Sequence, residues 1–298
     1  MSTLAPRIVV VSRPSELAEL QVRHGTRAAA AHFLRQRGQD LDEAIARDAT
    51  QTAALASVGA AIPVDWRRGH IDRDDLPRFL FGPEDIIVVV GQDGLVANVA
   101  KYTDTQPVIG VDPEPGRNPG VLVRHQPAAL AGLLAAAVAG NAQCQLRTMV
   151  SARLDDGQEL TGLNDMYVGH PSHQSSRYLI RVPDGESERH SSSGMVIGTG
   201  TGSTGWCSSI QHDRAGAPPL PEAEAATLVW FVREAWASPA TGTSLTSGVL
   251  DGAGRLEITA QAEGLVAFSD GLESDRLTLA YGQRLSVGVA DRRLRLVV

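Results

Sequence analysis

A run of branched apolar residues, Ile86 to Val90, constrains the chain more than any other stretch. Five consecutive Ile and Val residues are too few for a buried helix and too apolar for a strand with one wet face. The run therefore predicts a strand buried on both faces, as in a parallel sheet. The strand ends at Gly91-Gln92-Asp93-Gly94, and the residues from Leu95 to Tyr102 are typical of a helix. A strand, a glycine-flanked turn and a helix place backbone N–H groups at a helix N-terminus, where they can bind a phosphate.

The carboxylate of Asp93 lies where a phosphate-binding turn would normally avoid negative charge. Such a residue has a chemical reason to be there if it takes a proton from an attacking hydroxyl, or if it helps to hold a metal ion. Gly-x-Asp-Gly also occurs as an ordinary turn, so the turn by itself leaves a structural interpretation open.

Composition and charge argue against several classes of protein. The chain has 298 residues, enough for two domains, and 43% of them are hydrophobic, as in a globular protein. A net charge of −7 and an aromatic content of 4% argue against nucleic-acid binding, which needs basic and stacking surfaces. The longest run of small apolar residues, 128–139, is too short to span a bilayer. We therefore expect a cytoplasmic protein that binds neither nucleic acid nor membrane.

Two common phosphate-transfer motifs and the common metal motifs are missing. Lys101 is the only lysine and follows an alanine, whereas a Walker A loop needs Gly-Lys-Ser/Thr and a protein kinase needs a strand lysine. Cys144 and Cys207 form neither a disulfide framework nor a zinc pattern. His170 and His173 flank a proline that prevents a helix, and no carboxylate completes a metal triad with them. We expect no metal site built from protein side chains.

Residues 1–140 alternate strand-like and helix-like segments, which predicts a Rossmann-like α/β domain with a parallel sheet. The predicted strands are Arg7–Val11, Ile86–Val90 and Pro107–Val111, and the predicted helices are Leu17–Arg37, Leu41–Val58, Leu95–Tyr102 and Gln126–Ala139. The charged segment Asp65–Asp75 is expected to be exposed. Ligands bind beyond the carboxyl ends of strands in such sheets, so the turn at Asp93 and the loop after Val111 should face one crevice.

Residues 141–298 contain short strand-like runs between Gly, Asp and Pro turns. This pattern predicts a C-terminal β-rich domain with an antiparallel, β-sandwich-like structure. The predicted strands are Gln145–Leu154, Ser176–Val182, Met195–Gly198, Arg255–Ala262, Leu265–Ser269, Arg276–Leu279, Arg284–Val289 and Arg293–Val298. Two helices, Ser203–Ile210 and Glu222–Arg233, are expected to interrupt the strands.

The segment Gly198–Gly205 consists of four glycines and four hydroxyl-bearing residues and lies between a predicted strand and a predicted helix. Each glycine lets a ligand approach the backbone, and each hydroxyl can donate or accept a hydrogen bond. The segment contains G-x-G-x-x-G, but no βαβ unit surrounds it, so a dinucleotide fingerprint is disfavoured. A hydrolase nucleophile elbow is excluded because Thr201 stands where its first glycine would be. A purely structural glycine turn remains open.

Several segments resemble signatures of the NAD kinase and diacylglycerol kinase superfamily, and of the NAD kinases in particular. The turn at Asp93 resembles G-G-D-G, and Thr199 with Thr201–Thr204 matches the family's T-P-T-G-S-T in register. Further similar segments are Pro107–Val111, Asn164-Asp165, Ser244-Leu245 and Ser269–Gly271. The segments follow the family's order and cover most of the chain from about residue 86 onward.

The resemblance implies a kinase in which ATP, with Mg²⁺ bridging its phosphates, phosphorylates a hydroxyl of NAD. It implies an α/β domain and a β-rich domain with the active site between them, in a homo-oligomer such as a dimer or tetramer. Asp93 would be the base that deprotonates the acceptor hydroxyl. The residues expected to contact the nucleotides are Gly91, Gln92, Gly94, Asn164, Asp165, Thr199, Thr201, Thr204, Gly205 and Trp206.

The chain departs from the family's pattern at positions that bear on the substrate. Gln92 replaces a glycine and Leu95 a threonine of the first signature. Trp206 replaces a tyrosine and Gly205 an alanine of the second, and Asp165 is shorter than the family's glutamate. Two other functions therefore stay open: a kinase of the same mechanism for a sugar or lipid-like alcohol, and a nucleotide-binding regulator without turnover.

Overall fold

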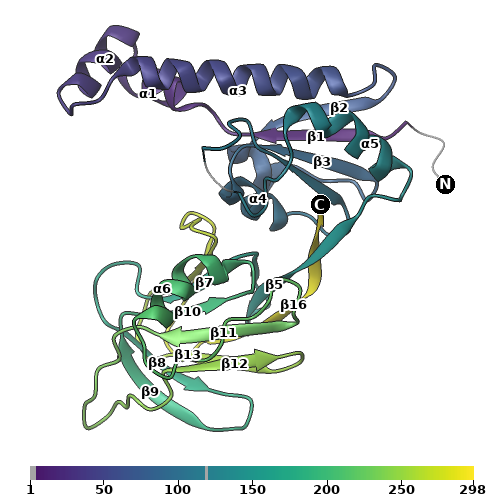
Figure 1. The fold of residues 1–298 in the computed structure, drawn as a ribbon. Coiled ribbons are helices and arrows are strands. Elements are labelled where there is room, and N and C mark those ends of the chain that lie inside the picture. The colour runs from purple at the N-terminus through teal and green to yellow at the C-terminus, as the bar shows by residue number, and fades with distance from the viewer. Residues whose placement is uncertain (1–4, 118–119) are drawn as a thin grey trace. The chain divides into compact units, whose positions relative to one another are not determined.

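The computed structural model describes residues 5–117 and 120–298, and the chain divides into two compact units (Figure 1). The first unit comprises the residues up to Cys144 together with Arg295–Val298, and the second comprises Gln145–Leu294. The last four residues join the first unit because the end of strand β16 (Arg284–Val297) pairs with strand β4 (Pro107–Val111). The sequence had placed the whole tail in the second domain.

The first unit contains a parallel sheet in the order β2-β1-β3-β4-β16, as the buried run at its centre predicted. Strands β1 (Arg7–Ser12) and β3 (Asp85–Val90) are buried on both faces. Strand β2 (Arg67–Asp72) lies at the edge, where the sequence had predicted only an exposed charged segment. Charged side chains are common on edge strands because they hinder pairing with other chains, so the charge concealed the strand.

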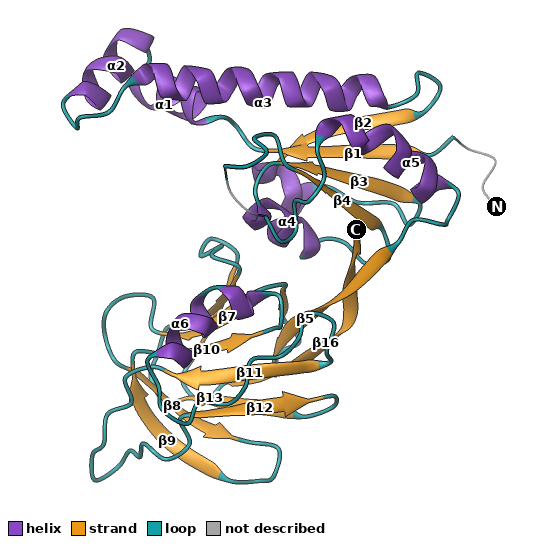
Figure 2. Cartoon of the chain, in the orientation of Figure 1, coloured by secondary structure: helices purple, strands orange, loops and turns teal. Residues whose placement is uncertain are grey.

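Helices cover both faces of this sheet (Figure 2). Helices α3 (Leu41–Ala61) and α5 (Leu130–Val138) pack on one face, and α4 (Asp93–Ala100) lies on the other. The expected helix Leu17–Arg37 is divided into α1 (Glu16–His24) and α2 (Arg27–Arg35). Gly25, with a φ of 74°, ends α1 and the hydroxyl of Thr26 caps α2, which is a C-terminal glycine followed by a new N-cap.

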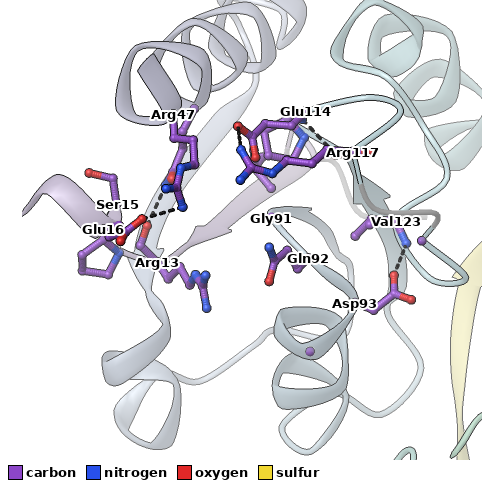
Figure 3. Close-up of a pocket in the computed structure, with 17 residues that line it drawn as sticks. Arg13, Ser15, Glu16, Arg47, Gly91, Gln92, Asp93, Glu114, Arg117 and Val123 are labelled. Atoms are coloured by element: carbon purple, nitrogen blue, oxygen red, sulfur yellow. Dashed lines mark hydrogen bonds and ion pairs between the residues drawn. The ribbon is translucent and has the colours of Figure 1, made fainter. Parts of the chain in front are cut away.

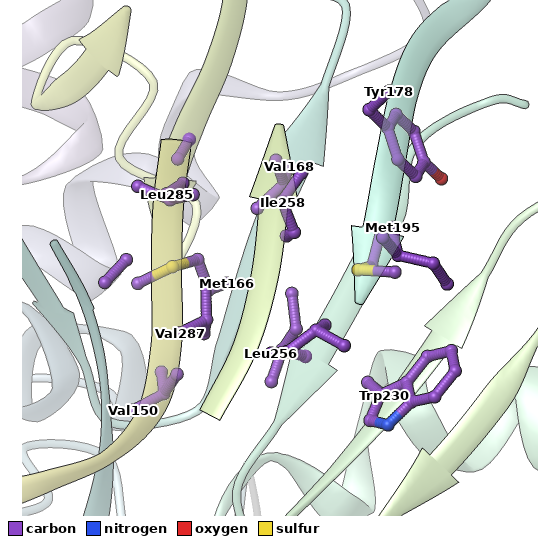
Figure 4. Packing of buried hydrophobic residues seen from close by; sticks show 14 of the residues in the cluster. Val150, Met166, Val168, Tyr178, Met195, Trp230, Leu256, Ile258, Leu285 and Val287 are labelled. Atoms are coloured by element: carbon purple, nitrogen blue, oxygen red, sulfur yellow. The ribbon is translucent and has the colours of Figure 1, made fainter. Parts of the chain in front are cut away.

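The second unit has two sheets that enclose one hydrophobic core (Figure 4). The antiparallel six-stranded sheet has the order β12-β11-β10-β7-β14-β15, and the facing sheet contains β16, β13, β8 and β9, with β5 beside β16 and β6 beside β5. The bounds are β5 Cys144–Leu154, β6 Glu159–Gly162, β7 Asp165–Gly169, β8 Ser176–Arg181, β9 Ser187–Ser192, β10 Met195–Gly198, β11 Thr227–Val232, β12 Ser247–Asp251, β13 Arg255–Ala260, β14 Leu265–Ser269 and β15 Arg276–Leu279. A short helix, α6 (Trp206–His212), covers the outer face of the six-stranded sheet.

The predicted helix Glu222–Arg233 is wrong, because residues Thr227–Val232 form strand β11 between β10 and β12. Leu228 and Trp230 pack in the core between the sheets, whereas Val229 and Phe231 pack beneath α6. Both faces of β11 are therefore buried, which removes the polar alternation that marks a strand with one wet face. No helix in the described part of the chain is long and apolar enough to cross a membrane.

Candidate functional site

A cavity of about 370 Å³ lies beyond the carboxyl ends of β1, β3 and β4 in the first unit (Figure 3). Its walls come from the loops that follow these three strands, from the start of α1 and from the side of α3. The turn Gly91–Gly94 lines it, together with Asp112 from the loop after β4. The prediction that these two loops face one crevice is confirmed, because the carboxyl ends of neighbouring parallel strands meet at one edge of the sheet.

The turn presents backbone to this cavity as the sequence predicted. Gln92 is the N-cap of α4 but makes no capping hydrogen bond with its side chain, and Asp93 is the first helical residue. A Cβ atom added at Gly94 would meet no protein atom within 4 Å, so this glycine faces open space. A Cβ at Gly91 would lie 3.1 Å from Leu95 Cδ2, so the Leu95 side chain would have to shift to admit it.

Three arginines line the cavity, and sequence reasoning had singled out none of them. Arg47 pairs with Glu16 at 2.6 Å, and Arg117 pairs with Glu114 at 3.3 Å. Among the described residues, none forms a hydrogen bond or ion pair with the guanidinium of Arg13, which is exposed at the end of β1. A guanidinium without a carboxylate partner, beside an open helix N-terminus, suits the binding of an anionic group.

Asp93 has partners that the sequence did not reveal. The backbone N–H of Val121 donates to Oδ2 at 2.7 Å, and those of Leu122 and Val123 donate to Oδ1 at 2.9 and 3.0 Å. The same segment lies against Gly110 of β4, where a Cβ would overlap the carbonyl oxygen of Leu122. The carboxylate thus fastens the segment after the β4 loop to the start of α4, whatever else it does.

In the second unit, the Gly198–Gly205 segment connects β10 to α6. At most of its glycines, other protein atoms lie too close to leave room for a Cβ atom. A Cβ at Gly200 would overlap the carbonyl oxygen of Glu222, and one at Gly202 would overlap that of Asn164. At Gly198 it would overlap the thiol of Cys207. Close packing therefore explains these three glycines without a ligand, whereas the sequence analysis expected each of them to let a ligand approach the backbone. Gly205 is exposed and its Cβ would make an ordinary contact, 3.7 Å from the carbonyl oxygen of Gly202, so of the four glycines it alone leaves room for a side chain.

Hydroxyl groups hold this segment in place. The hydroxyl of Thr199 donates to the carbonyl of Leu163 at 2.6 Å and accepts from the backbone N–H of Thr201 at 3.1 Å. That of Ser203 donates to the carbonyl of Thr199 at 3.1 Å. Thr201 is 5% exposed, and within the described chain its hydroxyl has no hydrogen-bond partner, whereas Thr204 is exposed. Thr199 is therefore structural, and Thr201 and Thr204 keep free hydroxyls.

Asn164 and Asp165 lie at the start of β7, beside this segment. The carboxylate of Asp270 accepts hydrogen bonds from the backbone N–H groups of Leu163 and Asn164, at 2.9 and 2.7 Å. The carbonyl of Asn164 accepts from the N–H of Thr199 at 2.9 Å. Burial raises the pKa of Asp165 to about 6, and no described residue donates a hydrogen bond to its carboxylate. The backbone at this pair is fixed on both sides, while its two side chains stay available.

An aromatic cavity of about 210 Å³ lies beside Trp206, at the N-terminus of α6. Tyr167 of β7 and Trp206 are nearly parallel, with ring centroids 6.1 Å apart, and Phe268 of β14 lies 5.1 Å from Tyr167. The guanidinium of Arg233 lies 5.1 Å from the Trp206 ring. Sequence reasoning found Trp206 and missed the others, whose proximity arises only from the pairing of distant strands.

The described residues contain no group of three or more His, Cys, Asp and Glu side chains that could hold a metal ion. Both cysteines are free, and burial raises the pKa of Cys207 to about 12, so its thiol stays protonated at neutral pH. The predicted contact residues thus form two groups. Those of the Gly91–Gly94 turn line the cavity of the first unit, and the remaining ones cluster around the start of β7 and the β10–α6 connection of the second.

The chain is similar in sequence to curated NAD kinases. The NAD kinase of Chlorobaculum tepidum is 28% identical over 136 residues, which cover 45% of this chain and 45% of that protein. The NAD kinase of Chlorobium phaeobacteroides is 25% identical over 140 residues, 46% of each chain. The chain therefore spans about half the length of the curated relatives it matches. No protein-family model matches it.

The similarity to a solved structure extends over the whole chain. A crystal structure of yeast NADH kinase complexed with NADH aligns with 100% of this chain and 84% of that chain, with a TM-score of 0.63 and 14% sequence identity. At this identity the likeness establishes the fold, which is the two-domain fold of the NAD kinases. The predicted combination of an α/β part and an antiparallel β-rich part is confirmed.

Proposed function

We propose that this chain, a divergent member of the NAD kinase family, transfers a phosphoryl group from ATP to a hydroxyl of NAD or NADH. The observation that carries the proposal is the cavity at the Gly91–Gly94 turn, where exposed backbone, an open helix N-terminus and Arg13 come together. Phosphoryl transfer depends mainly on positioning and charge stabilisation, and this cavity supplies both for a polyphosphate. The similarity to proteins named NAD kinase and NADH kinase supports a pyridine nucleotide as the acceptor.

The acceptor would bind in the second unit. Asn164 and Asp165 have side chains without protein hydrogen-bond partners among the described residues, and they can bond a ribose. The cavity beside Trp206 is lined by aromatic rings, which suits one of the two planar bases of a dinucleotide. The resemblance assigns the proton-accepting role to Asp93, whose place at the turn of the first cavity would put it near the donor phosphates.

Mg²⁺ would arrive with the nucleotide. No protein-built cage is present in the described parts of the chain, and Mg²⁺ in phosphotransferases commonly has few protein ligands besides the substrate phosphates. Two acidic side chains of the cavity already have partners among the described residues: Glu114 is paired with Arg117, and Asp112 accepts a hydrogen bond from the N–H of Glu114. When bound, the ion would neutralise charge on the phosphates, while Arg13 and the backbone of the turn would orient them.

The direct test incubates the purified chain with ATP, Mg²⁺ and either NAD or NADH, and measures NADP or NADPH with a dehydrogenase specific for the phosphorylated form. We expect product that depends on both substrates. Transfer from labelled ATP to a sugar or lipid-like alcohol, with none to NAD or NADH, would favour the other acceptor class. Binding of nucleotides in a thermal-shift assay without any transfer would favour the regulator.

Gly94→Ala should weaken phosphate binding without destabilising the fold. Its Cβ would meet no protein atom, and alanine is favoured over glycine in a helix by about 0.5–1 kcal/mol, so the melting temperature should be unchanged or higher. The methyl group would point into the space where phosphates approach the turn. We expect the KM for ATP to rise about tenfold, equivalent to about 1.4 kcal/mol, and the KM for NAD to change little. An unchanged KM for ATP would mean that the donor does not approach this turn.

Arg13→Gln should weaken the binding of ATP without changing the stability of the fold. Hydrogen bonds to charged groups contribute about 1.5–3 kcal/mol, so we expect the KM for ATP to rise about 10- to 100-fold. The matched control is Arg117→Gln in the same cavity, whose guanidinium is already paired with Glu114 and should matter less. Initial rates at varied ATP concentration distinguish the two, and equal effects would contradict a special role for Arg13.

A further inference from the structure

We propose that Asp48 and Gln51 of α3 are positioning residues for the phosphoryl donor, because they hold the loop Arg13–Glu16 so that the guanidinium of Arg13 stays at the cavity beside the Gly91–Gly94 turn. The inference rests on the proposed function, since it places the donor in this cavity, and it goes further by naming the helix that prepares the cavity. All the groups concerned belong to the first unit.

Polar residues interrupt the inward-facing stripe of α3. Both Asp48 and Gln51 are half-buried. They lie between Ala44 and Ala54 at steps of four, three and three residues, which keeps them on the face of the helix that is buried at either end. The buried residues of that face are Leu41, Ala44, Ala54 and Val58. Two positions that could carry apolar residues of the core therefore carry side chains that form hydrogen bonds.

Both polar side chains bind the loop that leads from β1 to α1. The side-chain amide of Gln51 donates from Nε2 to the backbone carbonyl of Arg13 at 2.7 Å. The hydroxyl of Ser15 donates to Oδ1 of Asp48 at 2.5 Å, and it also accepts from the backbone N–H of Ala18, so the same hydroxyl caps α1. Helix α3 therefore fixes the loop at Arg13 and again at Ser15.

Further contacts hold the two ends of this loop. At the start of α1, Glu16 pairs with Arg47 of α3 at 2.6 Å (Figure 3). At the end of β1, the hydroxyl of Ser12 lies 2.8 Å from Nε2 of His70 in β2. Side chains of α3 and β2 therefore hold the chain on either side of Arg13.

Holding this backbone matters because the guanidinium of Arg13 has no protein partner among the described residues. An arginine loses conformational freedom when it binds a phosphate, and a mobile backbone would add to that loss. Fixing the backbone before the donor arrives removes part of this cost. Gln51 belongs to the cavity wall, whereas Asp48 is bound to Ser15 behind it, so Asp48 acts on the donor through the loop.

The first test compares Asp48→Ala with Asp48→Asn by the Kd for ATP with Mg²⁺, measured by isothermal titration calorimetry. Both variants remove the negative charge, which by itself should favour an anion, and only asparagine keeps an oxygen that accepts from Ser15. We expect Asp48→Asn to bind ATP at least as tightly as the wild type. Asp48→Ala should bind about 3- to 10-fold more weakly, as expected for one lost hydrogen bond. Equal Kd values for the two variants would overturn the role of Asp48.

Gln51→Met removes the hydrogen-bond donor and keeps the length of the side chain. Methionine is a good helix former and adds apolar surface to the stripe, so the melting temperature should be unchanged or higher. The Kd and KM for ATP should rise about 3- to 10-fold, while kcat and the acceptor KM should change little. Thr52→Met, at an exposed position of the same helix, is the matched control and should change none of these values. An unchanged Kd for ATP in Gln51→Met would overturn its role.

A double variant separates positioning from direct contact with the donor. If Gln51 acts through Arg13, Gln51→Met should add little to the loss caused by Arg13→Gln, because the guanidinium that it positions is then absent. Full additivity of the two losses in ATP affinity would show that Gln51 contacts the donor itself, and the positioning role would fail.

Measuring ATP binding separately from turnover distinguishes this inference from the proposed function. If the wild-type chain bound ATP but phosphorylated neither NAD nor NADH, the proposed function would fail, and the Kd comparisons would still decide the role of α3. If the wild-type chain bound no ATP, both would fail.

Discussion

Gly202→Ala is expected to disrupt the packing of the Gly198–Gly205 segment in the second unit. The new Cβ would overlap the backbone carbonyl oxygen of Asn164, and neither partner is a flexible side chain that can move away. That carbonyl is fixed by the N–H of Thr199, and the N–H of Asn164 is fixed by Asp270. We expect a loss of at least about 3 kcal/mol in the free energy of unfolding, because overpacking that displaces backbone is costly.

The loss should appear as a lower melting temperature and as weaker acceptor binding, since Asn164 adjoins the clash. Chemical denaturation gives the free energy directly, and the acceptor KM of any protein that remains folded gives the second effect. Gly132→Ala is the control, because this glycine lies in α5 with no atom within 4 Å of its added Cβ. It should be neutral or stabilising by about 0.4–1 kcal/mol. Equal stability of the two variants would contradict the packing role of Gly202.

Asp93→Ala is expected to destabilise the first unit, because three backbone N–H groups would lose their acceptor. A partly buried donor left without a partner costs about 1–3 kcal/mol, and water can reach some of them, so we expect about 2–4 kcal/mol in total. For a chain of this size, the melting temperature should fall by about 5–15 °C. Turnover should fall too, since the segment at Val121–Val123 borders the donor cavity.

A graded series distinguishes this holding role from chemistry at Asp93. Asp93→Asn keeps one acceptor oxygen, so its melting temperature should lie between those of the wild type and Asp93→Ala. Asp112→Ala is the matched control in the same cavity, because among the described residues Asp112 accepts only the N–H of Glu114, so its removal should cost much less. If Asp93→Asn melted like the wild type and still lost about 10²- to 10⁴-fold in kcat, the loss would be chemical, as expected of a general base.

The central strand and its turn could be predicted from local sequence because burial on both faces leaves an unmistakable apolar run. Ile86–Val90 is strand β3, with Gly91–Gly94 lining a cavity at its carboxyl end, where parallel sheets place their ligands. The same reasoning failed at Glu222–Arg233, since β11 is also buried on both faces but follows an alanine-rich stretch that imitates a helix. It failed again at β2, whose charges gave no apolar signal.

The amino-acid sequence was enough to identify the turn that carries Asp93, the Gly198–Gly205 segment and the order of the α/β part and the β-rich part, because these depend on residues close together in the chain. The contacts of the side chains in the two cavities became known from the three-dimensional structure alone. Asp93 meets N–H groups about thirty positions away, and Arg13 enters the same cavity because β1 lies beside β3. Asp165 loses water, and so gains its raised pKa, through α6 and the neighbouring strands. Desolvation and hydrogen bonding depend on the whole packed environment, and no local pattern of residues encodes them.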